Sequence, residues 1–289
     1  MPRIGRILLP IDFQDLSKRV VHQAAVLARH FHSEIVMLHV VTPLTYSAGM
    51  LEGSYVPANL ADLLKELLRQ AQGNLDEALK PELNGLAVKR VLVEGDPART
   101  IVRTAHDEKV DLIAMPTHGY GAFRRFLLGS VASKVLHDSE CPIWTGAHLE
   151  EEPAREFAIR NIVCAIDLGA HSPKTVQWAA QLAAEFGARL TLAHITPGAE
   201  VYGPDGFDFG PAWKEGLVQS AAQQIAKLQQ EIGTKAQVFI ENGDVPKLLD
   251  QAAKQNEGDV LVIGRPPHGR LRATGYGIIR ESHIPVLSV

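Results

Sequence analysis

The sequence has little cysteine and no long hydrophobic run. Only Cys141 and Cys164 occur in 289 residues, both in or beside apolar runs, which favours reduced core thiols over a disulfide framework. No stretch comes near the ~18 consecutive apolar residues that a transmembrane helix needs. The basic N-terminus leads into a strand pattern and not into the apolar region of a signal peptide, so the sequence predicts a cytoplasmic protein.

An excess of charge of one sign is also lacking. Lys and Arg number 29 against 33 Asp and Glu, which gives a net charge of −4. This balance gives no general reason to expect binding to nucleic acid or to a membrane surface. A hydrophobic content of 46% is typical of a globular protein, and the length is sufficient for two domains that each bury a core.

Sequence motifs of common enzymes are missing as well. The chain contains no Gly-x-Ser-x-Gly elbow, no P-loop that ends in Gly-Lys-Ser/Thr, no His-Glu-x-x-His and no zinc-type spacing of Cys and His. The sequence therefore predicts no catalytic residue, no metal site built from side chains and no enzyme. Slow hydrolysis of a bound nucleotide stays open, although no residue stands out as the base that would orient water.

Short apolar runs alternate with helical patterns along the chain. In the first half the strand-like runs cover 7–12, 35–41, 88–93, 111–115 and 141–145, and helical patterns cover 17–30, 60–79, 98–109 and 131–137. Gly95-Asp96-Pro97 is a turn that supplies an N-cap carboxylate and a proline at the first helical position. This alternation predicts an α/β fold with parallel strands and right-handed crossovers.

The second half repeats the first. The paired positions are Asp12 and Asp167, and His39 and His194, at an offset of 155, and Asp111 and Asp259 at an offset of 148. The repeat predicts an N-terminal domain over residues 1–147 and a C-terminal domain over 156–289, joined by an acidic linker. The two histidines lie at strand ends, where a hydrogen-bonded structural role is favoured over a ligand or a base.

The stretch 111–145 carries the most functional information. Its strand-like run is followed by His118-Gly119, by nine further residues, and by Gly129-Ser130 at the start of a helical pattern. Backbone N–H groups of a glycine-bearing loop and of a helix N-terminus bind anions, so the stretch predicts a phosphate site. The alternative is that Gly129-Ser130 is an ordinary helix start, because serine is a favoured N-cap and glycine often precedes it. In the second half the loop is seven residues shorter, and Gly275 is followed by Tyr276 and not by a hydroxyl residue.

At these residues the sequence resembles the universal stress protein family in its tandem-domain form, over essentially the whole chain. Nucleotide-binding members of that family carry Gly-x2-Gly-x9-Gly-Ser/Thr after the fourth strand, and here Gly119, Gly129 and Ser130 match while Pro116 replaces the first glycine. The resemblance implies two five-stranded parallel-sheet layer sandwiches, Rossmann-like, with strand order 3-2-1-4-5. It further implies that the last strands of the two domains pair, which makes an intrachain pseudo-dimer.

The resemblance also assigns roles to individual positions. It places Pro10, Asp12, Val40 and Met115 around the adenine and ribose, and it places Gly119, Gly129, Ser130 and the amide of Val131 at the phosphates. His118 lies in the same loop, as a ligand contact or as a hydrogen-bonding residue that stabilises the loop. In the second half the aspartate and several apolar positions recur, so remnants of an adenosine pocket are expected there without a triphosphate site.

The function that follows is an ATP-binding stress-response protein that acts as a sensor or regulatory module, with ATP in the N-terminal domain. Magnesium would be held largely by the phosphates and water. The alternatives are a nucleotide-independent interaction protein that works as a dimer, which Pro116 and the short second loop favour, and more weakly a slow ATP-hydrolysing enzyme. The expected partner is an adenine nucleotide, without nucleic acid or membrane, and a homodimer is left open.

Overall fold

The computed structural model describes residues 4–13, 18–42, 60–117, 128–147, 157–197, 211–266, 271 and 273–289. In the first half the elements are β1 (Arg6–Pro10), α1 (Lys18–Phe31), β2 (Glu34–Val41), α3 (Leu60–Glu77), β3 (Val88–Glu94), α4 (Pro97–Asp107), β4 (Leu112–Met115), α5 (Ser130–Asp138) and β5 (Ile143–Thr145). In the second half they are β6 (Asn161–Ala165), α6 (Ser172–Phe186), β7 (Arg189–Pro197), α7 (Pro211–Ile232), β8 (Gln237–Gly243), α8 (Val245–Gln255), β9 (Val260–Ile263), α9 (Ala273–Glu281) and β10 (Val286–Ser288).

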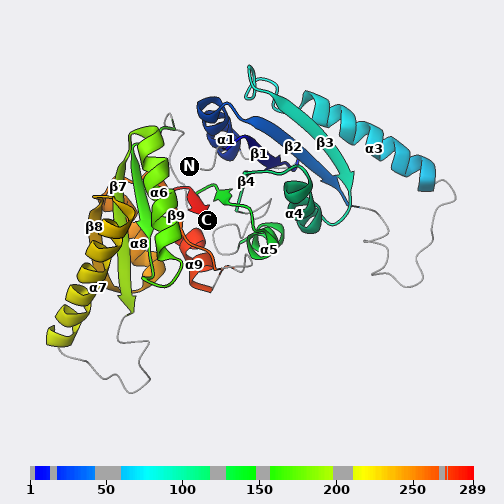
Figure 1. Cartoon of the computed structure of the whole chain (residues 1–289). Helices are drawn as coiled ribbons and strands as arrows, with labels where there is room; N and C mark the ends of the chain where they lie inside the picture. The colour runs from blue at the N-terminus through cyan, green and yellow to red at the C-terminus, as the bar shows by residue number, and fades with distance from the viewer. Residues whose placement is uncertain are drawn as a thin grey trace, which may run out of the picture.

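The described strands form one ten-stranded sheet in the order β3-β2-β1-β4-β5-β10-β9-β6-β7-β8. Within each half all neighbouring strands are parallel, and the expected order 3-2-1-4-5 is confirmed in the first half and mirrored in the second. The halves join where β5 and β10 pair antiparallel, with Thr145 opposite Val286. The predicted pairing of the last strands within one chain is therefore confirmed (Figure 1).

Helices cover both faces of the sheet, which explains the continuous apolar runs of the central strands. Ile7, Leu8 and Leu9 of β1 are all buried because successive side chains point to opposite, equally covered faces. One hydrophobic cluster includes residues of α1, α3, α6 and α7, and a second includes residues of α4, α5, α8 and α9. Each cluster draws residues from both halves of the chain, so the core is continuous across the joint.

The starts of α4 and α8 show why the local sequence forms helices there. The Asp96 carboxylate accepts a hydrogen bond from the Arg99 N–H at 2.9 Å, and a proline occupies the first turn of α4. The corresponding Asp244 caps α8 through the Lys247 N–H at 3.0 Å. Each carboxylate satisfies an N–H that has no partner inside its helix, as predicted from Gly95-Asp96-Pro97.

A second contact between the halves lies on the α1 and α6 side of the sheet. The ring of His30 stacks on Phe186 with a centroid distance of 4.1 Å, and its Nε2 lies 3.0 Å from the Glu185 carboxylate. The Phe31 ring meets Phe186 edge-on at 5.7 Å. The two halves thus meet through side chains of α1 and α6 as well as through the sheet.

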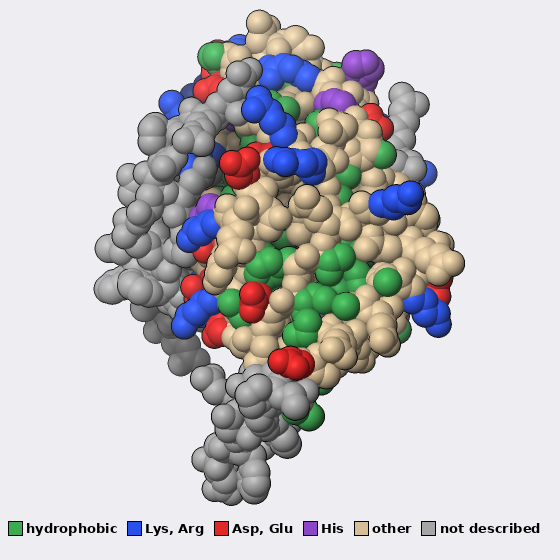
Figure 2. All heavy atoms as spheres, turned by 90° about the vertical axis from the view of Figure 1, so that its left-hand side faces the viewer, with side chains coloured by type: hydrophobic (Ala, Val, Ile, Leu, Met, Phe, Trp, Pro, Cys, Tyr) green, Lys and Arg blue, Asp and Glu red, His purple; other side chains and the backbone are tan. Residues whose placement is uncertain are grey.

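The ends of the sheet are the strands β3 and β8. Figure 2 views the molecule from the β8 end and shows a small group of hydrophobic side chains among scattered charged ones. Val238 of β8 belongs to the exposed apolar residues, with 45% of its surface accessible. Charged residues lie along β3, at Lys89, Arg90 and Glu94, whereas β8 has one, Glu241, so the charges that discourage pairing with further strands are concentrated at the β3 edge. Among the described helices, none is both long and apolar enough to cross a membrane.

Candidate functional site

The predicted adenine and ribose positions lie at the carboxyl ends of the parallel strands in the first half. Pro10 and Met115 are the last residues of β1 and β4, and Val40 is the last but one of β2. Asp12 follows β1 and is exposed. Open α/β sheets bind ligands at this edge, so the topology brings these residues to the expected place.

The predicted phosphate positions lie at the start of α5. Gly129 is the N-cap, and its N–H donates to the Thr117 carbonyl oxygen at 2.8 Å, which ties the helix start to the residues that follow β4. Ser130 is the first residue inside the helix, so the N-cap position expected for its hydroxyl is wrong, while an ordinary helix start stays the alternative to a phosphate site. The N–H groups of Ser130 and Val131 belong to the first turn, where a helix leaves its donors without internal acceptors.

The structure brings part of the predicted set together. Met115 is buried in the hydrophobic cluster against which Val40, Leu128 and Val131 pack. Met115 and Val40 therefore share one face of the sheet with the start of α5. His118 and Gly119, with the rest of the loop over 118–127, lie outside the described residues.

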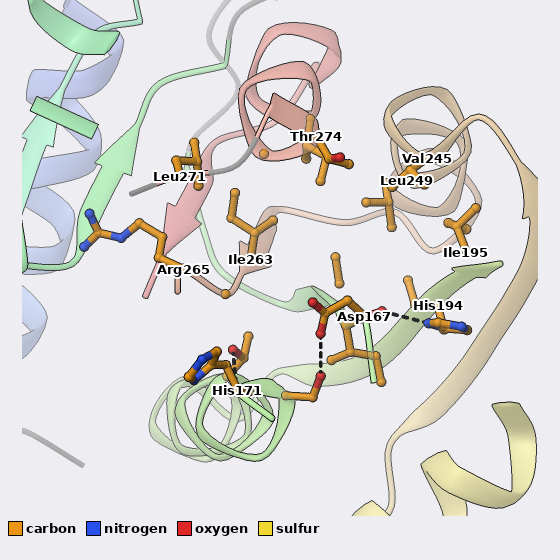
Figure 3. Close-up of a pocket in the computed structure, with 18 of the residues that line it drawn as sticks. Asp167, His171, His194, Ile195, Val245, Leu249, Ile263, Arg265, Leu271 and Thr274 are labelled. Atoms are coloured by element: carbon orange, nitrogen blue, oxygen red, sulfur yellow. Dashed lines mark hydrogen bonds between the residues drawn. The ribbon is translucent and has the colours of Figure 1, made fainter. Parts of the chain in front are cut away.

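The second half contains a cavity at the same edge of the sheet. Its volume is about 320 Å³, within the range of small-molecule sites. Figure 3 shows side chains that converge on it from the ends of the strands and from the starts of α6, α8 and α9. The walls are mainly apolar, with Ile195, Ile263 and Leu271 among them, and polar groups come from Asp167, Ser172 and Thr274.

The cavity lining corresponds to the positions singled out in the first half. At offsets of 155 and 148, the counterparts of Pro10, Asp12, Val40 and Met115 are Ala165, Asp167, Ile195 and Ile263, and all four line the cavity. The strand registers agree with these offsets, because Ile7 lies opposite Leu112 in β4 and Ile162 lies opposite Val260 in β9. A cavity of ligand size thus lies where the resemblance implies the remnant of an adenosine pocket.

The polar groups of the cavity are partly committed to the protein. The Asp167 carboxylate accepts hydrogen bonds from the Gly169 N–H at 2.8 Å and from the Ser172 hydroxyl at 3.0 Å. His194 Nδ1 lies 2.9 Å from the Ile166 carbonyl oxygen, and in the first half His39 Nδ1 lies 3.0 Å from the Ile11 carbonyl. The same hydrogen bond in both halves supports the structural role predicted for the two histidines.

Helix α9 begins at an earlier residue than the comparison of Gly275 with Gly129 predicts. Gly275-Tyr276 does not occupy the place of Gly129-Ser130, because α9 begins at Ala273. The first residues of α5 and α9, Ser130 and Ala273, and their last residues are related by a common offset of 143. Ser130 therefore corresponds to Ala273, and Tyr276 corresponds to Ser133. The second half lacks the hydroxyl at its helix start, as predicted, but at a different residue.

Sequence reasoning missed Arg265 and Thr274, which also line the cavity. Thr274 corresponds to Val131 and was hidden by the misplaced helix start. Arg265 corresponds to Thr117, and only 8% of it is exposed. A cation two residues after the apolar run of β9 was the signal that could have drawn attention to it, since a buried arginine needs hydrogen-bond acceptors.

Comparisons with known proteins agree with this architecture. The sequence profile of the Universal stress protein family matches residues 3–145 and again 158–289. The chain belongs to the universal stress protein family. It contains two copies of the family's domain in tandem, in agreement with the sheet order and the internal repeat.

Relatives of both lengths are found. Universal stress protein MJ0531 of Methanocaldococcus jannaschii is 34% identical over 143 residues, which cover 48% of this chain and 79% of that protein. A universal stress protein of Mycolicibacterium smegmatis is 25% identical over 276 residues, 93% of this chain and 89% of the relative. The crystal structure of a universal stress protein from Archaeoglobus fulgidus shares the fold, with a TM-score of 0.70, 20% identity and coverage of 99% and 98% of the two chains.

Proposed function

We propose that the protein binds an adenine nucleotide, with ATP as the leading ligand, in its N-terminal half and acts as a sensor or regulatory module of a stress response. The observation that carries the proposal is the correspondence between Pro10, Asp12, Val40 and Met115 and four residues that line the cavity of the second half. The membership in the universal stress protein family supports the stress-response role.

The start of α5 supports binding of the phosphates. The N–H groups of Ser130 and Val131 lie in the first turn of a nine-residue helix, next to the end of β4. The helix dipole favours an anion there, and the donors need an acceptor from outside the helix. A magnesium ion would bridge the phosphates and keep water as its other ligands. The protein would therefore hold the metal through the nucleotide.

The second half suits a smaller ligand that lacks the triphosphate. Its helix α9 starts with Ala273, so no hydroxyl takes the place of Ser130. The cavity offers apolar walls and the Asp167 carboxylate, which suit a base and a ribose. We therefore assign the triphosphate to the first half and, at most, a nucleoside to the second.

The first experiment identifies what the purified protein carries. Heating the protein and separating the released small molecules by chromatography is expected to yield an adenine nucleotide, and calorimetry with added ATP is expected to show binding. If no adenine nucleotide is released and calorimetry detects no binding of ATP, the proposal is contradicted.

The second experiment locates the phosphates with a matched pair of variants. Ser130→Glu puts a carboxylate at the start of α5, and Ala273→Glu puts the same carboxylate at the corresponding, exposed start of α9. We expect Ser130→Glu to abolish ATP binding and ATP-dependent thermal stabilisation because like charges repel at close range. Ala273→Glu should keep both. Loss in Ala273→Glu alone would move the site to the second half.

The alternative function is that of a nucleotide-independent interaction protein. Pro116 favours it, because proline replaces a family glycine directly after β4 and has no N–H to donate. Under this alternative, Ser130→Glu leaves both partner binding and the thermal response to ATP unchanged. Turnover of ATP well above background that disappears in Asp12→Asn would instead support the enzyme.

A further inference from the structure

Helix α5 is held from outside by the opposite half of the chain. The Tyr276 hydroxyl of α9 donates a hydrogen bond to the Ser133 carbonyl oxygen at 3.2 Å. Arg265, which follows β9, donates through Nη1 to the Ser139 carbonyl oxygen at 2.8 Å and through Nη2 to the Cys141 carbonyl oxygen. Two side chains of the second half therefore bind three backbone carbonyls in and directly after α5.

The contact of Tyr276 reaches the turn that carries the candidate phosphate donors. The Ser133 N–H closes the first turn of α5 on the Gly129 carbonyl oxygen at 2.8 Å, so Ser133 is part of the turn that begins at Ser130. Burial raises the pKa of the Tyr276 hydroxyl, and the nearby Asp138 adds to this shift, so the hydroxyl stays protonated and can donate at neutral pH. A displacement of this contact would be passed to the helix start.

The second contact requires the burial of a charged side chain, Arg265. It is 8% exposed, and its Nε has no hydrogen-bond partner among the described residues. Burial lowers the pKa of Arg265, which reflects the cost of removing the guanidinium from water. Figure 3 shows the guanidinium turned away from the cavity that the residue lines. Its guanidinium therefore donates hydrogen bonds to carbonyls of the other half and does not point into the cavity.

The carbonyls that Arg265 binds mark the passage from α5 into β5. Ser139 is the C-cap of α5, and Cys141 lies two residues before the first residue of β5. On the opposite end, the Thr117 carbonyl holds the Gly129 N–H. Helix α5 is thus fixed at its start by its own half and by Tyr276, and at its end by Arg265.

We propose that Tyr276 and Arg265 are positioning residues for the phosphate site of the opposite half: they hold α5 so that its first amides face the nucleotide. The inference rests on the proposed binding of ATP at α5. The adenine-side residues Asp12, Val40 and Met115 lie in or after strands that pair within the first half, so the sheet sets their backbone positions even though Met115 also packs in the cluster that includes α5. Loosening α5 therefore weakens the phosphate contacts selectively.

The test compares ATP with adenosine in Tyr276→Phe, which removes a single hydroxyl. ATP affinity is measured by calorimetry, and adenosine affinity by displacement of a fluorescent ATP analogue, so that only the ATP site is monitored. We expect the dissociation constant of ATP to rise about 2- to 12-fold, the equivalent of one hydrogen bond, and that of adenosine to stay unchanged. Arg265→Lys, which cannot reproduce the forked pair of donors, should change the same ratio in the same direction.

Ser288→Ala provides the matched control. The Ser288 hydroxyl donates to the Ile143 carbonyl oxygen at 3.3 Å, a buried hydrogen bond between the halves that does not touch α5. This variant should keep the ratio of ATP to adenosine affinity. If the ratio of ATP affinity to adenosine affinity in Tyr276→Phe equals that of the wild type, the positioning role is overturned while the nucleotide function stands. This holds both when neither affinity changes and when the two fall by the same factor. Absence of ATP binding in the wild type overturns both.

Discussion

At the scale of single residues, two aspartates hold the starts of the central strands. The Asp111 carboxylate accepts hydrogen bonds from the Gly5 and Arg6 N–H groups at 2.8 and 2.9 Å. The Asp259 carboxylate does the same for Arg160 and Asn161 at 2.7 and 2.8 Å. These bonds join β4 to β1 and β9 to β6 at the amino ends, opposite the candidate sites, so their role is structural.

Removing either carboxylate should destabilise the fold without changing ligand binding. Asp111→Ala loses two backbone hydrogen bonds to a charged acceptor, each of which typically contributes about 1.5–3 kcal/mol, so we expect a loss of at least ~1.5 kcal/mol. Asp259→Ala should behave alike. Urea denaturation measures the change, and ATP calorimetry on the folded variants should be unaffected. A loss below ~0.5 kcal/mol would contradict this assignment.

Asp250 should make stability depend on pH in the acid range. Burial works to raise the pKa of its carboxyl, but hydrogen bonds from His283 and Lys254 outweigh burial and lower the pKa. A lowered pKa means that the stabilisation is fully present above the unfolded value of about 3.9 and is lost as pH falls through the folded value.

The corresponding variant is Asp250→Asn. Its stability deficit against the wild type, measured by urea denaturation from pH 6 down to pH 3, should be constant at the upper end and shrink below about pH 4. Asp62→Asn, at an exposed position of α3, serves as the control and should show no comparable change. If the stability deficit of Asp250→Asn grows on acidification, the lowered pKa of Asp250 is contradicted.

Individual side chains divide into those that the sequence predicts and those that it does not. The capping role of Asp96 follows from its neighbours in sequence, and the structural role of His39 follows from its place at a strand end. Arg265 depends on carbonyls more than 120 positions away, Ser139 and Cys141, so no local pattern could reveal it. Such long-range pairs become visible only once the two last strands are paired.

At the scale of elements, α4 and α8 offer a comparison within one chain. Each begins with an aspartate N-cap, and within the described part of the chain Asp96 alone of the two forms an ion pair as well, with Lys134 of α5 at 3.2 Å. Both partners of that pair are partly exposed, which limits its contribution.

The two N-cap variants should therefore be similar but not equal. Asp244→Ala is expected to cost about 1 kcal/mol, the usual effect of removing a cap. Asp96→Ala should cost the same plus the ion pair, which adds about 0–1 kcal/mol and which salt should remove. Denaturation at low and at high ionic strength measures both terms. A larger loss for Asp244→Ala than for Asp96→Ala would contradict the comparison.

Strands and most helices could be predicted, because burial on both faces and helical spacing leave clear periodic signals. The start of α9 could not. The comparison of Gly275-Tyr276 with Gly129-Ser130 places Gly275 at the helix start, but Gly275 lies inside α9, where a Cβ would meet the Leu271 side chain at 2.6 Å. The need for a small residue beside Leu271 arises from packing and leaves no pattern in the local sequence. The same error hid Thr274 and the correspondence between Tyr276 and Ser133.

At the scale of the whole molecule, the shared core predicts a single unfolding transition. The hydrophobic clusters cross the joint between the halves, and β5 and β10 share hydrogen bonds. Trp144 lies in the first half and Trp178 in the second. Two variants are compared, one with Trp144 and one with Trp178 as its single tryptophan. Their fluorescence should change at the same urea concentration. Separate midpoints would show that the halves unfold independently.

The joint between β5 and β10 also bears on biosynthesis. Thr145 and Val286 bond across a separation of 141 residues, so the first half leaves the ribosome well before its partner strand exists. During translation at about 5–20 residues per second, the edge of β5 stays uncovered for several seconds and could pair with another nascent chain. The strand is only three residues long, which leaves few hydrogen bonds for such a wrong pairing. The short β5 thus limits wrong pairing of the nascent chain, while the helices that pack over both faces of the sheet stabilise the joint in the folded protein.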